Sequence, residues 1–122
     1  MSEQQMNEFL SNTAGEVGKV SLRNQGGFVV KLDFVYKTSD GKSKRVHGDQ
    51  KDITLGKTRT LDPGEYGVPE GATFTVHADV FWGKDNVGQT WLNYRKTNAV
   101  TGAYVITGTT LSNQLGFMGL EV

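Results

Sequence analysis

The sequence predicts an all-β protein, a single antiparallel β-sandwich of jelly-roll type with a short N-terminal helix. The first observation is composition: Val and Thr number 13 each and Ala only 5, and β-branched residues favour strands whereas Ala favours helices. The second is an alternation of apolar and polar side chains from residue 17 onward, the period of a half-buried strand. The third is the clustering of Gly, Pro, Asn and Asp between the alternating segments, which is typical of turns in a sandwich.

Residues 1–16 are predicted to be a separate helical or flexible segment in front of a sandwich domain over 17–122. Met6, Phe9 and Leu10 fall at positions i, i+3 and i+4, which predicts one apolar stripe on a short helix. A helix of this length is marginal in water by itself. We therefore expect it to be ordered only in an oligomer or on lipid, with the stripe as its interaction surface.

The first half of the sandwich contains two alternating runs. Val20 and Leu22 alternate with polar residues and precede a glycine-rich turn. The longer run that follows is expected to face the core with Phe28, Val30, Leu32, Phe34 and Tyr36. Asp40 and Gly41 then predict a hairpin, so the polar, basic stretch 43–50 is expected to return as an exposed strand.

The clearest strand of the second half is predicted over 74–82. Its expected core-facing side chains are Phe74, Val76, Ala78, Val80 and Trp82. Phe81 is expected to point to the opposite face, because successive side chains of a strand alternate. Further strands are predicted over 91–96, 103–110 and 111–120.

The charges balance overall but are unevenly distributed. Thirteen basic and 13 acidic residues give a formal net charge of zero, so no general basic field predicts nucleic acid as a partner. Residues 19–59 nevertheless carry ten basic and four acidic side chains. Their densest point, Lys42, Lys44 and Arg45, is a candidate patch for phosphate or anionic lipid, or alternatively a solvated edge that resists aggregation.

The composition also bears on location. The absence of Cys excludes disulfides, thiolate metal sites and Cys nucleophiles, and small secreted domains often use disulfides. The N-terminus lacks the basic and apolar regions of a signal peptide, so we expect a cytoplasmic protein or one exported without a signal peptide. No apolar run is long enough to predict a transmembrane segment.

No catalytic motif stands out, and we expect no enzyme activity, no cofactor and no metal site. His47 and His77 are the only histidines, whereas a zinc site needs several ligands within reach of one another. The stretch 56–58 ends like a phosphate-binding loop, but Lys51 occupies the position where that motif needs its first glycine.

Aromatic and amide side chains of the second half form a candidate ligand site. An exposed ring beside amides suits stacking on a sugar or insertion among lipid headgroups. The predicted ligand-binding residues are Trp91, Tyr94, Asn86, Gln89 and Asn93. Alternation places Trp91 and Tyr94 on opposite faces of their strand, so one of the two should be more exposed. Alternatively, both are ordinary core and rim residues.

Four segments also suggest a family. They are Val-Ser-Leu-Arg-Asn-Gln-Gly-Gly at 20–27, Ile-Thr-Leu-Gly-Lys-Thr at 53–58, Val-Pro-Glu-Gly-Ala at 68–72 and Tyr-Val-Ile-Thr-Gly-Thr-Thr-Leu at 104–111. In layout, residues 18–120 resemble the aegerolysins of fungi and bacteria and the related PUD-type sandwich proteins of nematodes. The Cys- and Trp-rich central stretch of the aegerolysins has no counterpart here. The resemblance implies a small sandwich that recognises membrane lipid, and it transfers no binding residue.

Two functions remain open on these grounds. The first is a non-enzymatic, lectin-like or lipid-binding protein that recognises a lipid or glycan headgroup, associates with membranes or forms part of a toxin. The second is a self-assembling structural or interaction protein, a homo-oligomer or one of a pair, that joins through strand edges and its N-terminal segment.

Overall fold

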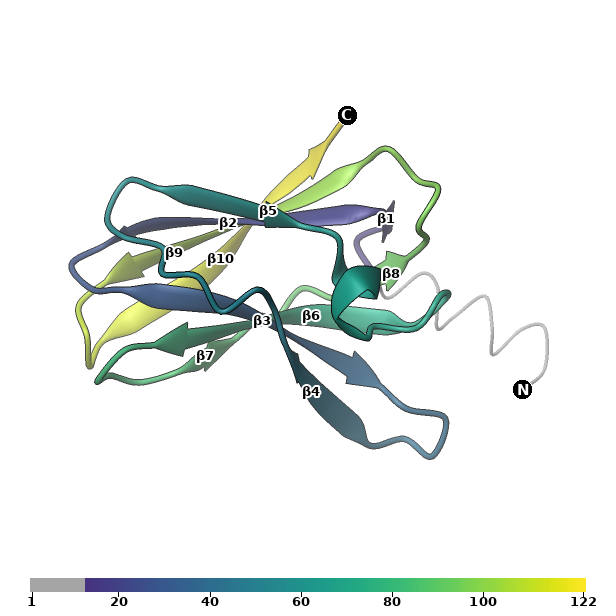
Figure 1. Ribbon diagram of the computed structural model, residues 1–122, viewed down its shortest axis with the longest axis horizontal. Helices are drawn as coiled ribbons and strands as arrows, with labels where there is room; N and C mark the ends of the chain where they lie inside the picture. The colour runs from purple at the N-terminus through teal and green to yellow at the C-terminus, as the bar shows by residue number, and fades with distance from the viewer. Residues whose placement is uncertain (1–12) are drawn as a thin grey trace.

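The computed structural model describes residues 13–122, which form two β-sheets packed face to face (Figure 1). The first sheet contains β1 (Glu16–Val17), β3 (Val30–Lys37), β4 (Ser43–His47), β6 (Thr73–Val80), β7 (Asn86–Val87) and β8 (Leu92–Tyr94). The second contains β2 (Lys19–Gly26), β5 (Thr58–Leu61), β9 (Thr101–Gly108) and β10 (Asn113–Glu121). The described residues contain one 3-10 helix, η1 (Pro63–Tyr66), and no α-helix. The predicted all-β sandwich is confirmed.

Alternation along the strands builds the core between the sheets. The fully buried side chains include Val20 and Leu22 of β2, Val30, Leu32 and Phe34 of β3, Phe74, Val76 and Ala78 of β6, and Ile106 of β9. Phe74 packs edge-on against Phe34 and Tyr94, with ring centroids 6.2 Å apart in both pairs. Each such side chain contributes about 1.5–3 kcal/mol when it leaves water. The sandwich is therefore a rigid support for its loops.

The sheets are not wholly antiparallel, in contrast to the prediction. The first sheet has the order β1-β8-β6-β3-β4, with β7 beside β6, and the second has the order β10-β9-β2-β5. β2 runs parallel to β9, from Lys19 opposite Thr101 to Gly26 opposite Gly108, and β1 runs parallel to β8. Strands β2 and β9 are separated in sequence by most of the first sheet, and a connection of that length permits a parallel pair. The order therefore departs from the antiparallel jelly roll.

The N-terminal prediction lies outside the described residues, because Met6, Phe9, Leu10 and the predicted helix all fall within 1–12. The described chain begins alongside β8, where the Ala14 N–H donates to the Trp91 carbonyl over 2.9 Å. Residues 13–122 contain no helix with the length and apolar character needed to cross a membrane.

Candidate functional site

Four loops lie together at one end of the sandwich, at the left in Figure 1. They are 26–29, 53–57, 81–85 and 108–112, and we call them the loop end. Backbone hydrogen bonds join them: the Lys84 N–H donates to the Thr110 carbonyl over 2.9 Å, and the Phe81 N–H donates to the Val29 carbonyl over 2.9 Å. The loop end is therefore a connected surface, although its parts come from distant stretches of the chain.

Asn24, at the end of β2, fixes two of these loops. Its side chain is fully buried, and its Nδ2 donates to the carbonyls of Phe28 (2.6 Å) and Ile53 (2.9 Å). Its Oδ1 accepts from the Gly26 N–H over 2.8 Å. All polar atoms of the amide are thus bonded to loop backbone, which holds the loops in one arrangement before any ligand binds.

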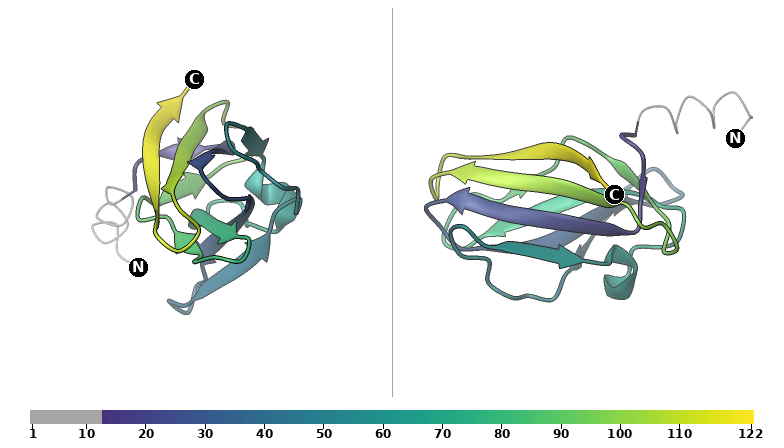
Figure 2. Two further views of the ribbon diagram at one scale, coloured as in Figure 1. Left: turned by 90° about the vertical axis from the view of Figure 1, so that its left-hand side faces the viewer. Right: turned by 90° about the horizontal axis from the view of Figure 1, so that it is seen from above.

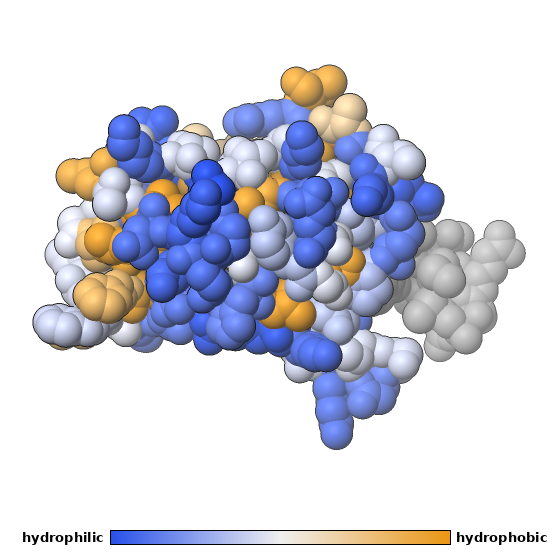
Figure 3. Space-filling model, in the orientation of Figure 1, coloured by the Kyte–Doolittle hydropathy of each residue, from blue (hydrophilic) through white to orange (hydrophobic). Residues whose placement is uncertain are grey.

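The loop end exposes four large apolar side chains. Their exposed fractions are 65% for Leu55, 59% for Phe81, 86% for Trp82 and 76% for Leu111. The rings of Phe81 and Trp82 stack on each other, with centroids 5.2 Å apart and planes 19° apart. Apolar surface is visible at this left-hand end in the space-filling view (Figure 3). Several large apolar side chains exposed at one end of a domain make that end a candidate interaction surface.

Trp82 does not face the core, so that prediction was wrong. Strand β6 ends at Val80, and Trp82 then adopts a left-handed backbone with φ of 53°. This conformation costs a bulky residue about 1–3 kcal/mol. Gly83 follows it at a close approach, where a Cβ would lie 2.3 Å from the Thr110 carbonyl oxygen. An unfavourable backbone that carries an aromatic ring into solvent makes Trp82 a candidate functional residue.

Two lysines flank the apolar side chains of the loop end. Lys57 and Lys84 are exposed, and neither side chain forms an ion pair or hydrogen bond within residues 13–122. Asp85 is instead turned toward the sandwich, where it accepts from the Val80 N–H and contacts His77 Nε2, each over 3.0 Å. The loop end therefore combines apolar side chains with two lysines whose ammonium groups have no partner within residues 13–122.

Two of the predicted ligand-binding residues, Tyr94 and Trp91, have different environments. Tyr94 is buried, and its hydroxyl donates to Asp62. Burial, together with that hydrogen bond, raises the pKa of Tyr94 to about 12. Trp91 is partly exposed, and the Lys37 ammonium lies 4.9 Å from its ring centroid. Trp91 is thus the more exposed of these two aromatic residues.

The three predicted amides are distributed over two places. Asn93 accepts from the Thr73 hydroxyl over 3.1 Å, near Trp91. Asn86 donates to the carbonyl and side-chain oxygens of Asn113 over 3.2 and 2.9 Å, and Gln89 lines the same polar hollow. The structure brings Asn86 and Gln89 together but separates them from Tyr94.

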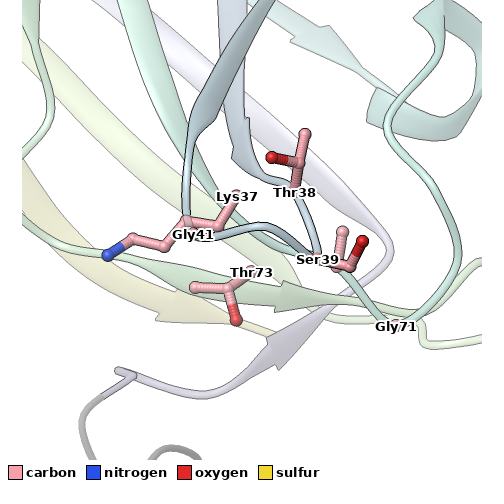
Figure 4. A pocket seen from close by; sticks show the side chains of 7 residues that line it. Lys37, Thr38, Ser39, Gly41, Gly71 and Thr73 are labelled. Carbon is pink, nitrogen blue, oxygen red and sulfur yellow. The ribbon is translucent and has the colours of Figure 1, made fainter.

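A hollow of about 470 Å³ lies at the other end, beside the hairpin between β3 and β4 (Figure 4). It is lined by Lys37, Thr38, Ser39, Gly41, Gly71 and Thr73. The Thr38 hydroxyl is already bonded to Asp40, and the Lys37 ammonium lies over the Trp91 ring. This hollow therefore offers a ligand few free polar groups.

The predicted basic patch is only partly free. Lys44 on β4 and Lys42, which directly precedes this strand, are both exposed. The Arg45 guanidinium instead binds the buried Asp33 carboxylate over 2.6 Å and lies 3.5 Å from Asp79 and 3.7 Å from Asp85.

The described part of the chain holds no cluster of three His, Cys, Asp or Glu side chains arranged to bind a metal ion. His47 and His77 lie against different carboxylates, Asp33 and Asp85.

No family model and no curated protein matches the chain. Solved structures similar to it include the human-specific toxin intermedilysin (TM-score 0.46, 18% identity, 85% of this chain and 23% of that chain) and listeriolysin O (0.45, 19%, 84% and 22%). They also include the cytotoxin suilysin from Streptococcus suis (0.44, 14%, 86% and 24%). The chain thus spans less than a quarter of each. The resemblance to aegerolysins and PUD-type proteins was wrong, because the similar solved structures named above are other toxins.

Proposed function

We propose that the protein binds the surface of a lipid membrane through the loop end. The observation that carries this proposal is the exposure of Leu55, Phe81, Trp82 and Leu111 together at one end of a rigid sandwich. Tryptophan is enriched at membrane–water interfaces, where its ring is apolar and its N–H can bond to headgroups. Each apolar side chain that enters the bilayer contributes up to about 1.5–3 kcal/mol, and preformed loops avoid the entropic cost of ordering.

The two free lysines favour anionic lipid. Lys57 and Lys84 each add about 1 kcal/mol at an anionic surface. We therefore infer that binding to neutral lipid depends on the apolar side chains, and that anionic lipid strengthens it in a salt-sensitive way. The headgroup-binding role predicted for Trp91, Tyr94, Asn86, Gln89 and Asn93 stays a separate prediction.

Replacing two of the exposed leucines tests the proposal. The double variant Leu55→Lys/Leu111→Lys is expected to lose about tenfold or more in partition onto phosphatidylcholine vesicles, since 1.4 kcal/mol corresponds to a factor of ten and each leucine contributes more when inserted. Co-sedimentation of protein with vesicles measures the partition. Neutral lipid is used so that the new charges are not attracted to the surface.

The matched control adds the same two charges elsewhere. Gly116→Lys/Met118→Lys places them on exposed positions of β10, outside the loop end, and should leave the partition at the wild-type value. The proposal fails if the loop-end variant co-sediments as well as the wild type, or if both double variants lose binding equally.

A further inference from the structure

We propose that a second copy of the chain pairs with the free edge of β10. This strand spans Asn113–Glu121 and forms the margin of the second sheet, where β9 is its one strand partner among residues 13–122. Figure 2 (right) shows β10, β9, β2 and β5 side by side, with β10 outermost. The outer edge of such a strand presents unpaired backbone donors and acceptors, which another strand can bind. The inference does not depend on the proposed lipid binding.

The other edge strands of the described residues are short or charged, as sheet edges usually are when they must avoid pairing. β1 and β7 have two residues each, and β5 has four. β4 carries Lys44 and Arg45 among its five residues. β10 has nine residues, and its one charged side chain is the terminal Glu121. β10 is therefore the margin that is both long and nearly uncharged.

The core is also incomplete along this margin. Leu115 and Phe117 pack against the hydrophobic core but remain partly exposed. The ring of Phe117 lies edge-on to Tyr104 of β9, with centroids 5.1 Å apart, and Tyr104 itself is only 2% exposed. Met118 (69% exposed) and Leu120 (44% exposed) add apolar surface on the same strand. An added strand would cover apolar groups as well as complete the hydrogen bonding.

The chemistry of the edge favours a second copy as the occupant. The Asn113 carbonyl already accepts from Asn86 Nδ2 over 3.2 Å, and the pairing register shifts between Phe117 and Gly119. Regular pairing is therefore limited to Gln114–Phe117, a stretch with no charged residue. Two-fold symmetric dimers are the commonest assemblies of identical chains, and a two-fold axis across the edge pairs this stretch with itself in the antiparallel sense. Because the formal net charge of the chain is zero, two copies do not repel each other through their net charge.

Antiparallel pairing leaves the loop end accessible. The loop 108–112 lies at the start of β10, so the two loop ends of a dimer face in opposite directions. Pairing and lipid binding therefore use different residues and can fail separately.

The test is the molar mass in solution, measured by light scattering and sedimentation over a concentration series. The wild type should rise from 13.4 kDa toward twice that value. Gly116→Lys/Met118→Lys should stay at the monomer mass, because the two-fold axis brings like charges together. The fold should tolerate this change: Met118 is exposed, and a Cβ at Gly116 would meet only Val105 Cγ1, at 3.8 Å. Circular dichroism checks that this variant is folded.

Leu55→Lys/Leu111→Lys carries the same added charge at the loop end and should dimerise like the wild type. A wild type that stays monomeric throughout, or an edge variant that dimerises as well as the wild type, overturns the proposal. Hydrogen exchange gives a second measurement: the amides of 114–117 should gain protection as protein concentration rises, and protection independent of concentration contradicts pairing.

Discussion

Asn24→Asp is expected to lower the free energy of unfolding by about 3 kcal/mol or more, although the two side chains have nearly the same size. The Asn24 amide donates to the carbonyls of Phe28 and Ile53 in a fully buried position. A carboxylate there would place an acceptor against two acceptors and bury a charge without a cation beside it. The loops 26–29 and 53–57 should then lose their fixed arrangement.

Urea unfolding at neutral pH measures this effect, and Gln25→Glu is the control. Gln25 is the next residue, is exposed, and makes no side-chain hydrogen bond within residues 13–122, so the same amide-to-carboxylate change should cost less than about 0.5 kcal/mol. Equal losses in the two variants would show that added negative charge, and not the buried amide, determines the result.

Asp33→Ala is expected to cost about 3 kcal/mol, because it removes the acceptor of several donors at once. The Asp33 carboxylate is fully buried within the first sheet. It accepts from Arg45 Nε and the nearer Arg45 terminal nitrogen over 3.1 and 2.6 Å, from the Gly48 N–H over 3.1 Å and from Gln50 Nε2 over 2.8 Å. His47 Nδ1 lies 3.1 Å away. Without Asp33, β4 and the turn after it lose their attachment to β3.

The same carboxylate predicts how stability depends on pH. Burial acts to raise the pKa of Asp33, but the hydrogen bonds, led by that from Arg45, outweigh burial and lower it below the usual 3.8. A group whose pKa is lower in the folded state stabilises the protein fully above its unfolded value, and this contribution is lost as pH falls through the folded value. Stability should therefore decline below about pH 4.

The acid-dependent loss should be smaller in Asp33→Ala than in the wild type, as measured by urea unfolding at neutral pH and at a pH below 3.8. Asp52→Ala is the control, since Asp52 is exposed and its side chain forms no ion pair or hydrogen bond within residues 13–122. If Asp33→Ala lost as much stability in acid as the wild type does, that result would contradict this role for the carboxylate.

Alternation predicted the core of this protein because it is a local property of the chain. Along β3 the inward positions Val30, Leu32 and Phe34 are all fully buried. The same pattern failed at Trp82 because it was extended past the end of β6 at Val80, into a turn where the backbone no longer alternates. Two adjacent aromatic residues directly before a glycine were the available signal for this turn.

The loop end could not be assembled from sequence. Leu55, Trp82 and Leu111 lie in separate turns, and what brings them together is the strand order, including the parallel pair of β2 and β9. Parallel pairing of distant strands leaves no local pattern. Asn24 did carry a signal, because it continues the inward positions of Val20 and Leu22, and an amide on a core face needs buried hydrogen-bond partners.

Trp82 and Trp91 are the two tryptophans of the chain, so each can be followed alone in a conservative variant. Trp91→Phe leaves Trp82, and Trp82→Phe leaves Trp91. The most direct measurement is tryptophan fluorescence with vesicles of phosphatidylcholine that carries bromine on its acyl chains, which quenches only rings that enter the bilayer. Binding through the loop end predicts strong quenching of Trp82 in Trp91→Phe and little quenching of Trp91 in Trp82→Phe. If Trp82 is not quenched, or if Trp91 is quenched instead, the result contradicts membrane binding through the loop end.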